Sequence, residues 1–439
     1  MSEFFIDTLA NGLRLLTVEM PHLHSVELAC TLGVGSRREE PGRYGISHFL
    51  EHMLFRGSED YPSGQDLEGR FEAIGGNINA ATDAETTCYH SRLHPAHIGD
   101  GLHLLASMLR RPLFAGLETE RSIVIEEAQE DLNQEGRFIS PDLLMNGLLW
   151  PGHPLSQPII GTLDAIATFD ETALRSHHQR YYTPANTVIA LAGRITRDAA
   201  LATVSDAFGD WRGPAPRPLC ASLPAPAKGP LSCWVRDTDS QLSLQLAFRI
   251  PGRQDPATPA LRMLRRILSG GGTTRLMRRL REDLGLTYNA EAHLSLFEEC
   301  GSFAVDLAVM PENLVPAVEE LLQIFLELVQ DPVGEGELAR VLGNYLFDLE
   351  FSQDHADLLA SRYSWGLTTG FLRSLEDERR ESRQLRPENL CEAARLYLTA
   401  ANLHLVVVGP YRQSDRQRVE GLLAGYRSSK AAAGTACTA

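Results

Sequence analysis

Three side chains that can bind or work with a metal lie within one short segment, His48-Phe-Leu-Glu51-His52. On a helix, histidines four residues apart project from one face, where two imidazoles can share a tetrahedral cation. Glu51 lies on that face too, within reach of a metal-bound water. Such a carboxylate can take the water's proton and later hand it to a leaving amine. The segment predicts a zinc centre with Glu51 as general base, although short His/Glu patterns also arise by chance.

A zinc ion held by two histidines usually takes a carboxylate as its third protein ligand. Acidic residues are frequent in 118–131. Glu120 and Glu127 are seven residues apart, so two helical turns bring them to one face, where one can bind metal and the other orient a ligand. Spacing alone does not separate Glu127 from Glu126 or Glu130, and a solvated acidic helix would show the same pattern.

The chain repeats itself once. Residues 182–193, YTPANTVIALAG, are echoed 216 positions later by 398–409, LTAANLHLVVVG. Residues 72–80 are echoed 210 positions later by 282–290. Two landmarks in the same order indicate a duplicated unit of about 200 residues.

A segment rich in proline and alanine, 213–230, separates the two copies and has the composition of a stiff, extended linker. We therefore expect a metal-binding catalytic domain over 1–212 and a homologous domain over 231–428. The remaining residues, 429–439, are expected to form a flexible tail.

Within the first copy, strand-like and helix-like patterns alternate irregularly. Strands are predicted at 12–18, 25–34, 77–93 and 188–191, and helices at 45–56, 64–74, 98–110, 118–135 and 170–180. The strands come in meanders beside helices rather than in strict βαβ alternation. This favours an α+β fold with a mainly antiparallel sheet packed with helices in each domain.

The second copy lacks the metal-binding residues. The positions of the metal-binding segment are occupied there by Arg262, Arg265 and Arg266, and guanidinium groups do not bind cations. The second domain is therefore expected to be inactive and to serve another purpose.

Composition narrows the function classes. The chain has 439 residues, 43% of them hydrophobic, and a formal charge of −16, which is typical of a globular protein. The sequence has no basic cluster of the kind that binds nucleic acid. No apolar run approaches the length of about 18 residues that is needed to span a bilayer. Seven scattered cysteines without CxxC spacing and the lack of a secretion signal predict a cytoplasmic protein.

Taken together, these motifs resemble the pitrilysin/insulinase family of zinc metallopeptidases, nearest its mitochondrial-processing-peptidase-like branch. H-x-x-E-H is the inverzincin motif, and the resemblance covers nearly the whole chain. The family's Glu-Arg…Glu pattern and its strand motif are matched by Glu120-Arg121, Glu127, Gly75-Gly76, Asn79-Ala80, Thr82 and Tyr89. The resemblance implies zinc ligation by His48, His52 and Glu127, with Glu51 as base and Glu120 supporting a ligand.

The resemblance also implies residues that contact substrate. Arg281 and Tyr288 match a family pair that lies near the zinc in the closed enzyme, where they can hold a peptide carbonyl and its oxyanion. On residue type alone they would be a surface arginine and a core tyrosine. Asn79 and Ala80 are implied as backbone contacts for a peptide that adds as a strand to a sheet edge.

Two other features are not expected to be sites. The turn Gly270-Gly271-Gly272 lacks the Gly-Lys-Ser/Thr that follows in a phosphate loop, so nucleotide binding is not expected and its role is open. The histidines at 90, 94, 97 and 103 share no obvious face and are expected to be ordinary surface or core residues.

The expected function is a zinc-dependent endopeptidase acting on peptides or short unfolded segments. One alternative is a dedicated protease for one small precursor peptide, and another is a non-catalytic scaffold subunit, because the family includes members without the metal residues. Family chains with two domains pair to form a closed chamber. Since this chain carries both the metal motif and the Arg/Tyr pair, a homodimer is expected over a heterodimer with a related chain.

Overall fold

The computed structural model describes residues 3–215, 223–225 and 229–426. They form two units, each with its own sheet and helices. Of the described residues, 3–130, 157–215 and 348–375 belong to the first unit, and 131–156, 223–225, 229–347 and 376–426 belong to the second. Part of the expected linker (216–222 and 226–228) and the whole expected tail lie outside the described residues. The segments 131–156 and 348–375 each pack with the other half of the sequence, an exchange that a division at one linker does not capture.

The first unit is built on a six-stranded sheet of order β1-β2-β6-β3-β5-β4, antiparallel except for the parallel pair β2–β6. Its strands are β1 Phe5–Thr8, β2 Arg14–Glu19, β3 Val26–Leu32, β4 Asn79–Thr82, β5 Thr87–Leu93 and β6 Thr187–Gly193. β4 lies at one edge of this sheet, and among the described strands it pairs with β5 alone.

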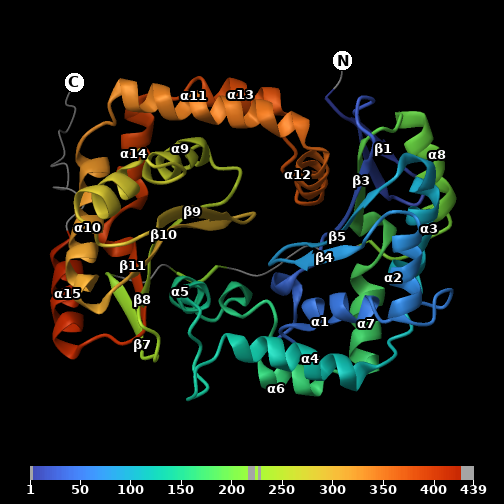
Figure 1. The fold of residues 1–439 in the computed structure, drawn as a ribbon, viewed down its shortest axis with the longest axis horizontal. Coiled ribbons are helices and arrows are strands. Elements are labelled where there is room, and N and C mark those ends of the chain that lie inside the picture. Colours follow the sequence, from blue (N-terminus) through green and yellow to red (C-terminus); the bar gives the residue numbers. More distant parts are fainter. Residues whose placement is uncertain (1–2, 216–222, 226–228, 427–439) are drawn as a thin grey trace, which may run out of the picture. The chain divides into compact units, whose positions relative to one another are not determined.

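The central strands β3 and β6 are buried along their whole length. Helix α12, Ala356–Thr368, packs on one face of them (Figure 1), and Thr31 of β3 donates a hydrogen bond to Ser364 of α12 at 2.9 Å. On the other face, Leu28 joins the hydrophobic core together with Phe49. Coverage on both faces explains why both strands are mostly apolar in the sequence, with Glu27, Thr31 and Thr187 as the polar exceptions.

Helix α1, Ile46–Leu54, carries the metal motif, and its start is closely fixed. The carboxylate of Glu39 accepts hydrogen bonds from the backbone N–H groups of Gly45, at 2.7 Å, and Ser47, at 2.8 Å. Gly45 has φ 98°, and a Cβ there would lie 2.3 Å from the carbonyl oxygen of Ile160. Only glycine fits this position without moving backbone.

Other helices of the first unit surround α1. It contacts α4, Leu117–Glu130, and α7, Glu171–Tyr181. The remaining helices are α2 Gly64–Ala73, α3 Ile98–Arg110, α6 Leu163–Thr168 and α8 Arg197–Phe208. Helix α2 begins after Ser63, whose hydroxyl accepts a hydrogen bond from the backbone of Asp66, a common N-terminal cap.

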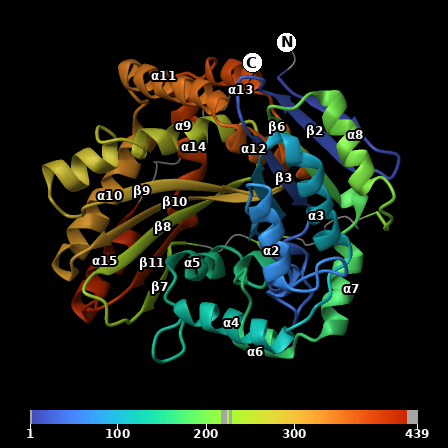
Figure 2. The ribbon, with the colours of Figure 1, turned by 45° about the vertical axis from the view of Figure 1, so that its right-hand side comes forward.

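The second unit is built on a five-stranded sheet of order β7-β11-β8-β10-β9. Its strands are β7 Leu231–Val235, β8 Leu242–Pro251, β9 Ala290–Leu296, β10 Cys300–Val309 and β11 Leu403–Val408. Figure 2 shows α5 (Pro141–Leu149) on one face of this sheet, and α10 (Leu314–Gln330) and α14 (Pro387–Tyr397) on the other. Its helices are α5 Pro141–Leu149, α9 Thr258–Leu268, α10 Leu314–Gln330, α11 Glu335–Phe351 (which ends in the first unit), α13 Leu375–Ser382, α14 Pro387–Tyr397 and α15 Gln413–Gly425.

The two sheets repeat one topology. The order β2-β6-β3-β5-β4 corresponds to β7-β11-β8-β10-β9, and each has one parallel pair at the same place. The repeated asparagines have one role: Asn186 donates to the carbonyl of Tyr181, at 2.8 Å, and Asn402 to that of Tyr397, at 2.7 Å. Each ties the end of a helix to the start of a buried strand. The predicted α+β class with two homologous, mainly antiparallel sheets is confirmed.

Some predicted elements differ in detail. The single strand expected over 77–93 is the hairpin β4–β5, because Asp83 accepts hydrogen bonds from the backbone of Glu85 and Thr86 and turns the chain. Helix α4 ends at Glu130, not 135. Among the described residues, no helix is long and apolar enough to cross a membrane.

Candidate metal centre

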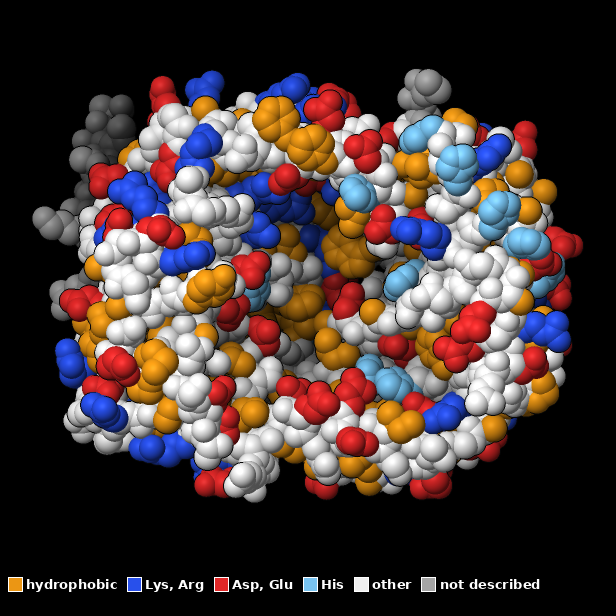
Figure 3. Space-filling model, viewed as in Figure 1, with side chains coloured by type: hydrophobic (Ala, Val, Ile, Leu, Met, Phe, Trp, Pro, Cys, Tyr) orange, Lys and Arg blue, Asp and Glu red, His pale blue; other side chains and the backbone are white. Residues whose placement is uncertain are grey.

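Helices α1 and α4 bring His48, His52 and Glu127 together. The two imidazole rings are 4.6 Å apart between centroids. The Nε2 atom of His48 lies 3.6 Å from one carboxylate oxygen of Glu127, and that of His52 lies 3.6 Å from the other. Glu126 and Glu130, the alternatives that spacing left open, do not belong to this group. In Figure 3, histidine and acidic side chains lie next to each other over α1 and α4.

The donor set fits a zinc ion. Tetrahedral ligands at about 2.1 Å from zinc stand roughly 3.4 Å apart, close to the separations found here. Burial, and then the charge of His52, lowers the pKa of His48 to about 4. A histidine that stays neutral keeps a lone pair for a metal, so these three residues can hold a cation with little movement.

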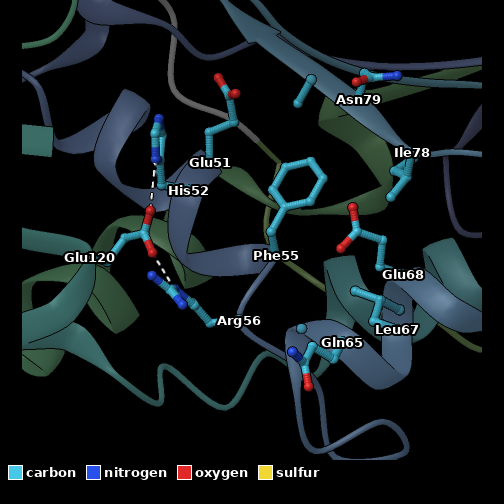
Figure 4. Close-up of a pocket in the computed structure, with 12 residues that line it drawn as sticks. Glu51, His52, Phe55, Arg56, Gln65, Leu67, Glu68, Ile78, Asn79 and Glu120 are labelled. Atoms are coloured by element: carbon cyan, nitrogen blue, oxygen red, sulfur yellow. Dashed lines mark hydrogen bonds and ion pairs between the residues drawn. The ribbon is translucent and has the colours of Figure 1, made fainter. Parts of the chain in front are cut away.

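Glu120 orients one of these histidines. Its carboxylate lies 2.8 Å from Nδ1 of His52 and also accepts a hydrogen bond from Nε of Arg56 (Figure 4). Burial acts against ionisation of Glu120, but the hydrogen bonds to His52 and Arg56 outweigh it and lower its pKa. An anionic Glu120 places the imidazole proton on Nδ1, which leaves Nε2 of His52 facing Glu127.

The two histidines differ in their electrostatics. Burial acts to lower the pKa of His52, but the hydrogen bond to Glu120 and the surrounding carboxylates outweigh burial and raise it. The Nδ1 atom of His48 is buried, and no described residue bonds to it. The acidic support is therefore concentrated on His52.

Glu51 points toward β4, away from Glu120 (Figure 4). Only 7% of it is exposed, and Thr82 of β4 donates a hydrogen bond to its carboxylate. Burial raises the pKa of Glu51, while the hydrogen bond from Thr82 opposes this. A carboxylate with a raised pKa is a better proton acceptor at neutral pH.

Two supporting residues, Arg56 and Thr82, were not among the predicted site residues. Arg56 follows His52 by four positions, a spacing that places it one helical turn further on. Thr82 belongs to the quoted strand motif, but its bond to Glu51 depends on how β4 packs beside α1. The sequence therefore indicates where each residue lies, but it does not identify the side chain that each one contacts.

The predicted peptide contacts Asn79 and Ala80 open the edge strand β4. They pair with His90 and Tyr89 of β5, and among the described residues no strand pairs with the other side of β4. Both line the same cavity as Glu51. An extended peptide can pair with such an edge.

In the second unit, Arg281 and Tyr288 contact each other. Arg281 lies in the π-helix η5, Met277–Asp283, and its guanidinium carbon is 4.8 Å from the centre of the Tyr288 ring. Tyr288 is 81% exposed, which differs from the core tyrosine that residue type alone would suggest. Their role toward a substrate stays a prediction.

The arginines that replace the metal-binding residues lie on α9 and have other partners. Arg262 pairs with Glu378 at 3.0 Å, and the guanidinium carbon of Arg266 lies 4.5 Å from the centre of the Tyr345 ring. These contacts help to fix α9 within its own unit.

A second group with metal-binding atoms, Asp142, His293 and Asp306, lies in the second unit. Its members already bond to protein: Gln245 donates to Asp142 at 2.5 Å and to Asp306 at 2.7 Å, and His293 lies 2.8 Å from Asp306. Sequence reasoning missed this group because α5, β9 and β10 supply its members.

The remaining features have surface positions. His97 pairs with Asp100 and His103 with Asp206, and neither histidine belongs to a metal-binding group among the described residues. Gly270–Gly272 form an exposed turn after α9, and its role stays open.

Comparison with known proteins follows the two halves of the sequence. Residues 14–163 match the family model described as insulinase (peptidase family M16), and residues 168–345 match the one described as peptidase M16 inactive domain. The chain belongs to peptidase family M16. This confirms the predicted family.

Related sequences are named zinc proteases. An uncharacterised zinc protease of Mycobacterium tuberculosis is 31% identical over 416 residues, 92% of each chain. The uncharacterised zinc protease YmxG of Bacillus subtilis is 30% identical over 355 residues, 78% of this chain and 84% of that one. These M16 relatives support a peptidase of the zinc class.

Solved structures share the fold. A protease from Helicobacter pylori has a TM-score of 0.86 at 20% identity, covering 93% of this chain and 99% of that one. An M16 inactive domain from Pseudomonas fluorescens has a TM-score of 0.83 at 24% identity, covering 94% and 99%. At such identities the likeness concerns the fold alone.

Proposed function

We propose that the chain is a zinc-dependent endopeptidase that hydrolyses peptides or short unfolded segments. The observation that carries this proposal is the convergence of both Nε2 atoms, each 3.6 Å from an oxygen of Glu127, beside the buried carboxylate of Glu51. His48, His52 and Glu127 would hold the ion.

The chemistry divides between the ion and the protein. When bound, zinc would supply Lewis acidity, which polarises a peptide carbonyl and acidifies the attacking water. Glu51 takes the proton from that water and delivers it to the leaving amine. Thr82 holds the Glu51 carboxylate in place, Glu120 keeps His52 in one tautomer, and the free edge of β4 aligns the peptide backbone.

The proposal is tested by separating metal binding from catalysis. Purified protein is expected to hold about one zinc per chain, and chelation is expected to abolish hydrolysis of a quenched-fluorescence peptide mixture. Glu51→Gln is expected to retain zinc and lose activity by about 100-fold or more, because its amide cannot accept the water's proton. The matched control is Glu126→Gln, an exposed position on α4. Normal hydrolysis by Glu51→Gln would falsify the general-base role.

A dedicated protease for one precursor peptide is the second candidate, and it uses the same centre. Cleavage of many members of a peptide library at comparable rates would favour general peptide turnover over this candidate. A non-catalytic scaffold is disfavoured, because a scaffold needs neither the paired His52–Glu120 support nor a buried Glu51.

A further inference from the structure

The group of Asp142, His293 and Asp306 in the second unit joins elements from both halves of the sequence. His293 lies on β9 and Asp306 on the neighbouring strand β10, whereas Asp142 lies in the first turn of α5. Helix α5 packs on β7, β8 and β11 of the same sheet (Figure 2). A ligand held by all three side chains would therefore fasten α5 to this sheet.

The three side chains offer one nitrogen and two oxygen atoms that lie within 4.8 Å of one another. Nδ1 of His293 is 2.8 Å from an oxygen of Asp306, and Nε2 of the same ring is 3.8 Å from an oxygen of Asp142. Both ring nitrogens of His293 thus face carboxylates. One imidazole and two carboxylates, without sulfur, form a donor set that suits a divalent transition-metal ion.

A fourth side chain, Gln245, reaches the same group from β8, where it lies directly opposite Asp306. Only 2% of Gln245 is exposed, and its amide nitrogen donates to Asp142 at 2.5 Å and to Asp306 at 2.7 Å. Among the described residues, no donor bonds to its amide oxygen. Rotation of the amide group by about 180° exchanges the two atoms and turns a possible metal ligand toward the carboxylates. The bonds that the group makes within the protein therefore do not exclude a metal ion.

The charges around His293 are negative. Its hydrogen bond to Asp306 raises the pKa of His293, burial opposes this increase, and the charge of Asp306 adds to it. The charges of Asp142 and Glu291 raise this pKa further. In the part of the chain that the structure describes, no arginine or lysine pairs with these carboxylates. Surroundings that favour a protonated imidazole also attract a metal cation.

We propose that Asp142, His293 and Asp306 form a second binding site for a divalent transition-metal ion such as Zn²⁺. The amide oxygen of Gln245 would be a further ligand, and the ion would fasten the first turn of α5 to β9 and β10. Since Asp142 is exposed and the other two residues are half-buried, we expect weaker binding than at the first centre. The site is expected to fill when metal is added, so purified protein still holds about one zinc per chain. This inference does not depend on peptidase activity.

The first experiment isolates the second site. The double variant His48→Ala/His52→Ala, which lacks two ligands of the first centre, is dialysed against buffers of rising free Zn²⁺ concentration. Atomic emission then gives zinc per chain, and a saturable curve that reaches about one ion is expected. Adding His293→Ala or Asp306→Asn to this background is expected to weaken zinc binding by about tenfold or more, because loss of a ligand should cost at least as much as loss of an outer partner.

The matched control is His103→Ala in the same background. His103 is an exposed histidine that lies beside a single carboxylate, that of Asp206, at 3.0 Å. Its removal is expected to leave zinc binding unchanged. Circular dichroism verifies that each variant is folded, and two ligand variants on different strands keep the test valid if one of them does not fold.

The second experiment tests whether the ion fastens α5. Zinc is expected to raise the melting temperature of the double variant by roughly 5 °C at a hundredfold excess over Kd. Asp142→Asn, which removes the ligand on α5, should lose this increase. Gln245→Glu places a carboxylate directly opposite Asp306, so it should melt lower without zinc and gain more from zinc than the double variant alone. A purely hydrogen-bonding role of Gln245 would predict the first of these effects without the second.

The outcomes bear on the second site alone. If the double variant binds no saturable zinc, or if His293→Ala and Asp306→Asn both leave its affinity unchanged, the proposed site does not exist. Loss of zinc binding in His103→Ala would place the ion on the surface near α3 and would overturn the proposal as well. Peptide hydrolysis by the wild type is measured separately, so the peptidase proposal stands or fails independently of these results.

Discussion

At the scale of single residues, the metal centre is asymmetric. His52 is held by the buried Glu120, whereas the Nδ1 atom of His48 has no bond to a described residue. Correspondingly, burial lowers the pKa of His48, while the carboxylates around His52 raise its pKa against the effect of burial. Although each Nε2 atom lies 3.6 Å from an oxygen of Glu127, the two histidines can therefore contribute differently to metal affinity.

The third ligand is tested by comparing adjacent glutamates on α4. Glu127→Gln is expected to lower zinc content sharply after dialysis, because two histidines alone hold zinc poorly. Glu126→Gln and Glu130→Gln are expected to keep the wild-type zinc content, since neither belongs to the ligand group. The measurement is metal per chain by atomic emission, and wild-type occupancy in Glu127→Gln would require a different third ligand.

Glu120 is expected to have an intermediate effect. Glu120→Gln weakens the orientation of His52 without removing a ligand, so zinc affinity or activity should fall about 10- to 100-fold. Glu118→Gln, on the first turn of the same helix and paired with Arg121, provides the control. Competition with a chromogenic chelator measures both affinities, and equal values for the two variants would show that Glu120 does not support the ligand.

At the scale of elements, the start of α1 depends on Glu39. Burial raises the pKa of this carboxyl to about 7, although hydrogen bonds from Ser47 and Gly45 favour its charged form. In the unfolded chain the pKa is near 4.5. Between these values the folded state binds a proton that the unfolded state has released, so this group's contribution to stability falls as the pH rises from about 4.5 to about 7.

Glu39→Gln is expected to remove this pH dependence. The melting temperature of the wild type should therefore fall relative to that of Glu39→Gln as the pH rises from 5 to 7. Above about pH 7.5 the difference between the two melting temperatures should stay constant. Glu40→Gln is the control, because Glu40 is exposed and pairs with Arg180. Scanning calorimetry at several pH values gives the difference, and parallel curves for wild type and Glu39→Gln would show that Glu39 does not titrate in this range.

Local patterns predicted the elements whose burial is simple. β3 and β6 are mostly apolar because both of their faces are covered, and the motif and periodicity of α1 predict a helix. The sequence pattern over 77–93 predicts one strand instead of the hairpin β4–β5, because the turn lies between two threonines, Thr82 and Thr87. This turn is formed by hydrogen bonds that the side chain of Asp83 accepts from the backbone. Long-range choices, such as the packing of α12 on β3, depend on contacts far apart in sequence and leave no local pattern.

The site was predictable to the same extent. His48, Glu51 and His52 lie within one helix, so their arrangement follows from helical geometry. The choice of Glu127 as third ligand depended on the family resemblance, because Glu126 and Glu130 on α4 also carry carboxylates. The bond from Thr82 to Glu51 requires a strand and a helix to meet, which spacing does not encode.

At the scale of the whole molecule, the two duplicated units carry different residues on corresponding helices. α1 of the first unit bears the metal-binding residues, and α9 of the second bears arginines that form ion pairs and ring contacts. The Arg281–Tyr288 pair, in contrast, belongs to the second unit. We propose that the working enzyme is a homodimer in which this pair of one chain acts on peptide bound at the metal centre of its partner.

Complementation tests this sharing. Homodimers of Glu51→Gln and of Arg281→Ala are both expected to be inactive, the first without a base and the second without its substrate contact. Mixing the two variants under conditions that exchange subunits should form mixed dimers with one intact composite site. Activity is expected to recover to about a quarter of wild type, because about half of the dimers are mixed and each has one working site of two.

The control for this experiment is Arg278→Ala, which removes an exposed arginine from the same π-helix and should leave activity unchanged. Subunit exchange is verified independently by native mass spectrometry with one isotopically labelled variant. If mixed dimers form and no activity returns, the sharing proposal is wrong, because one intact metal centre and one intact Arg281–Tyr288 pair would then be present on opposite chains without producing a working site.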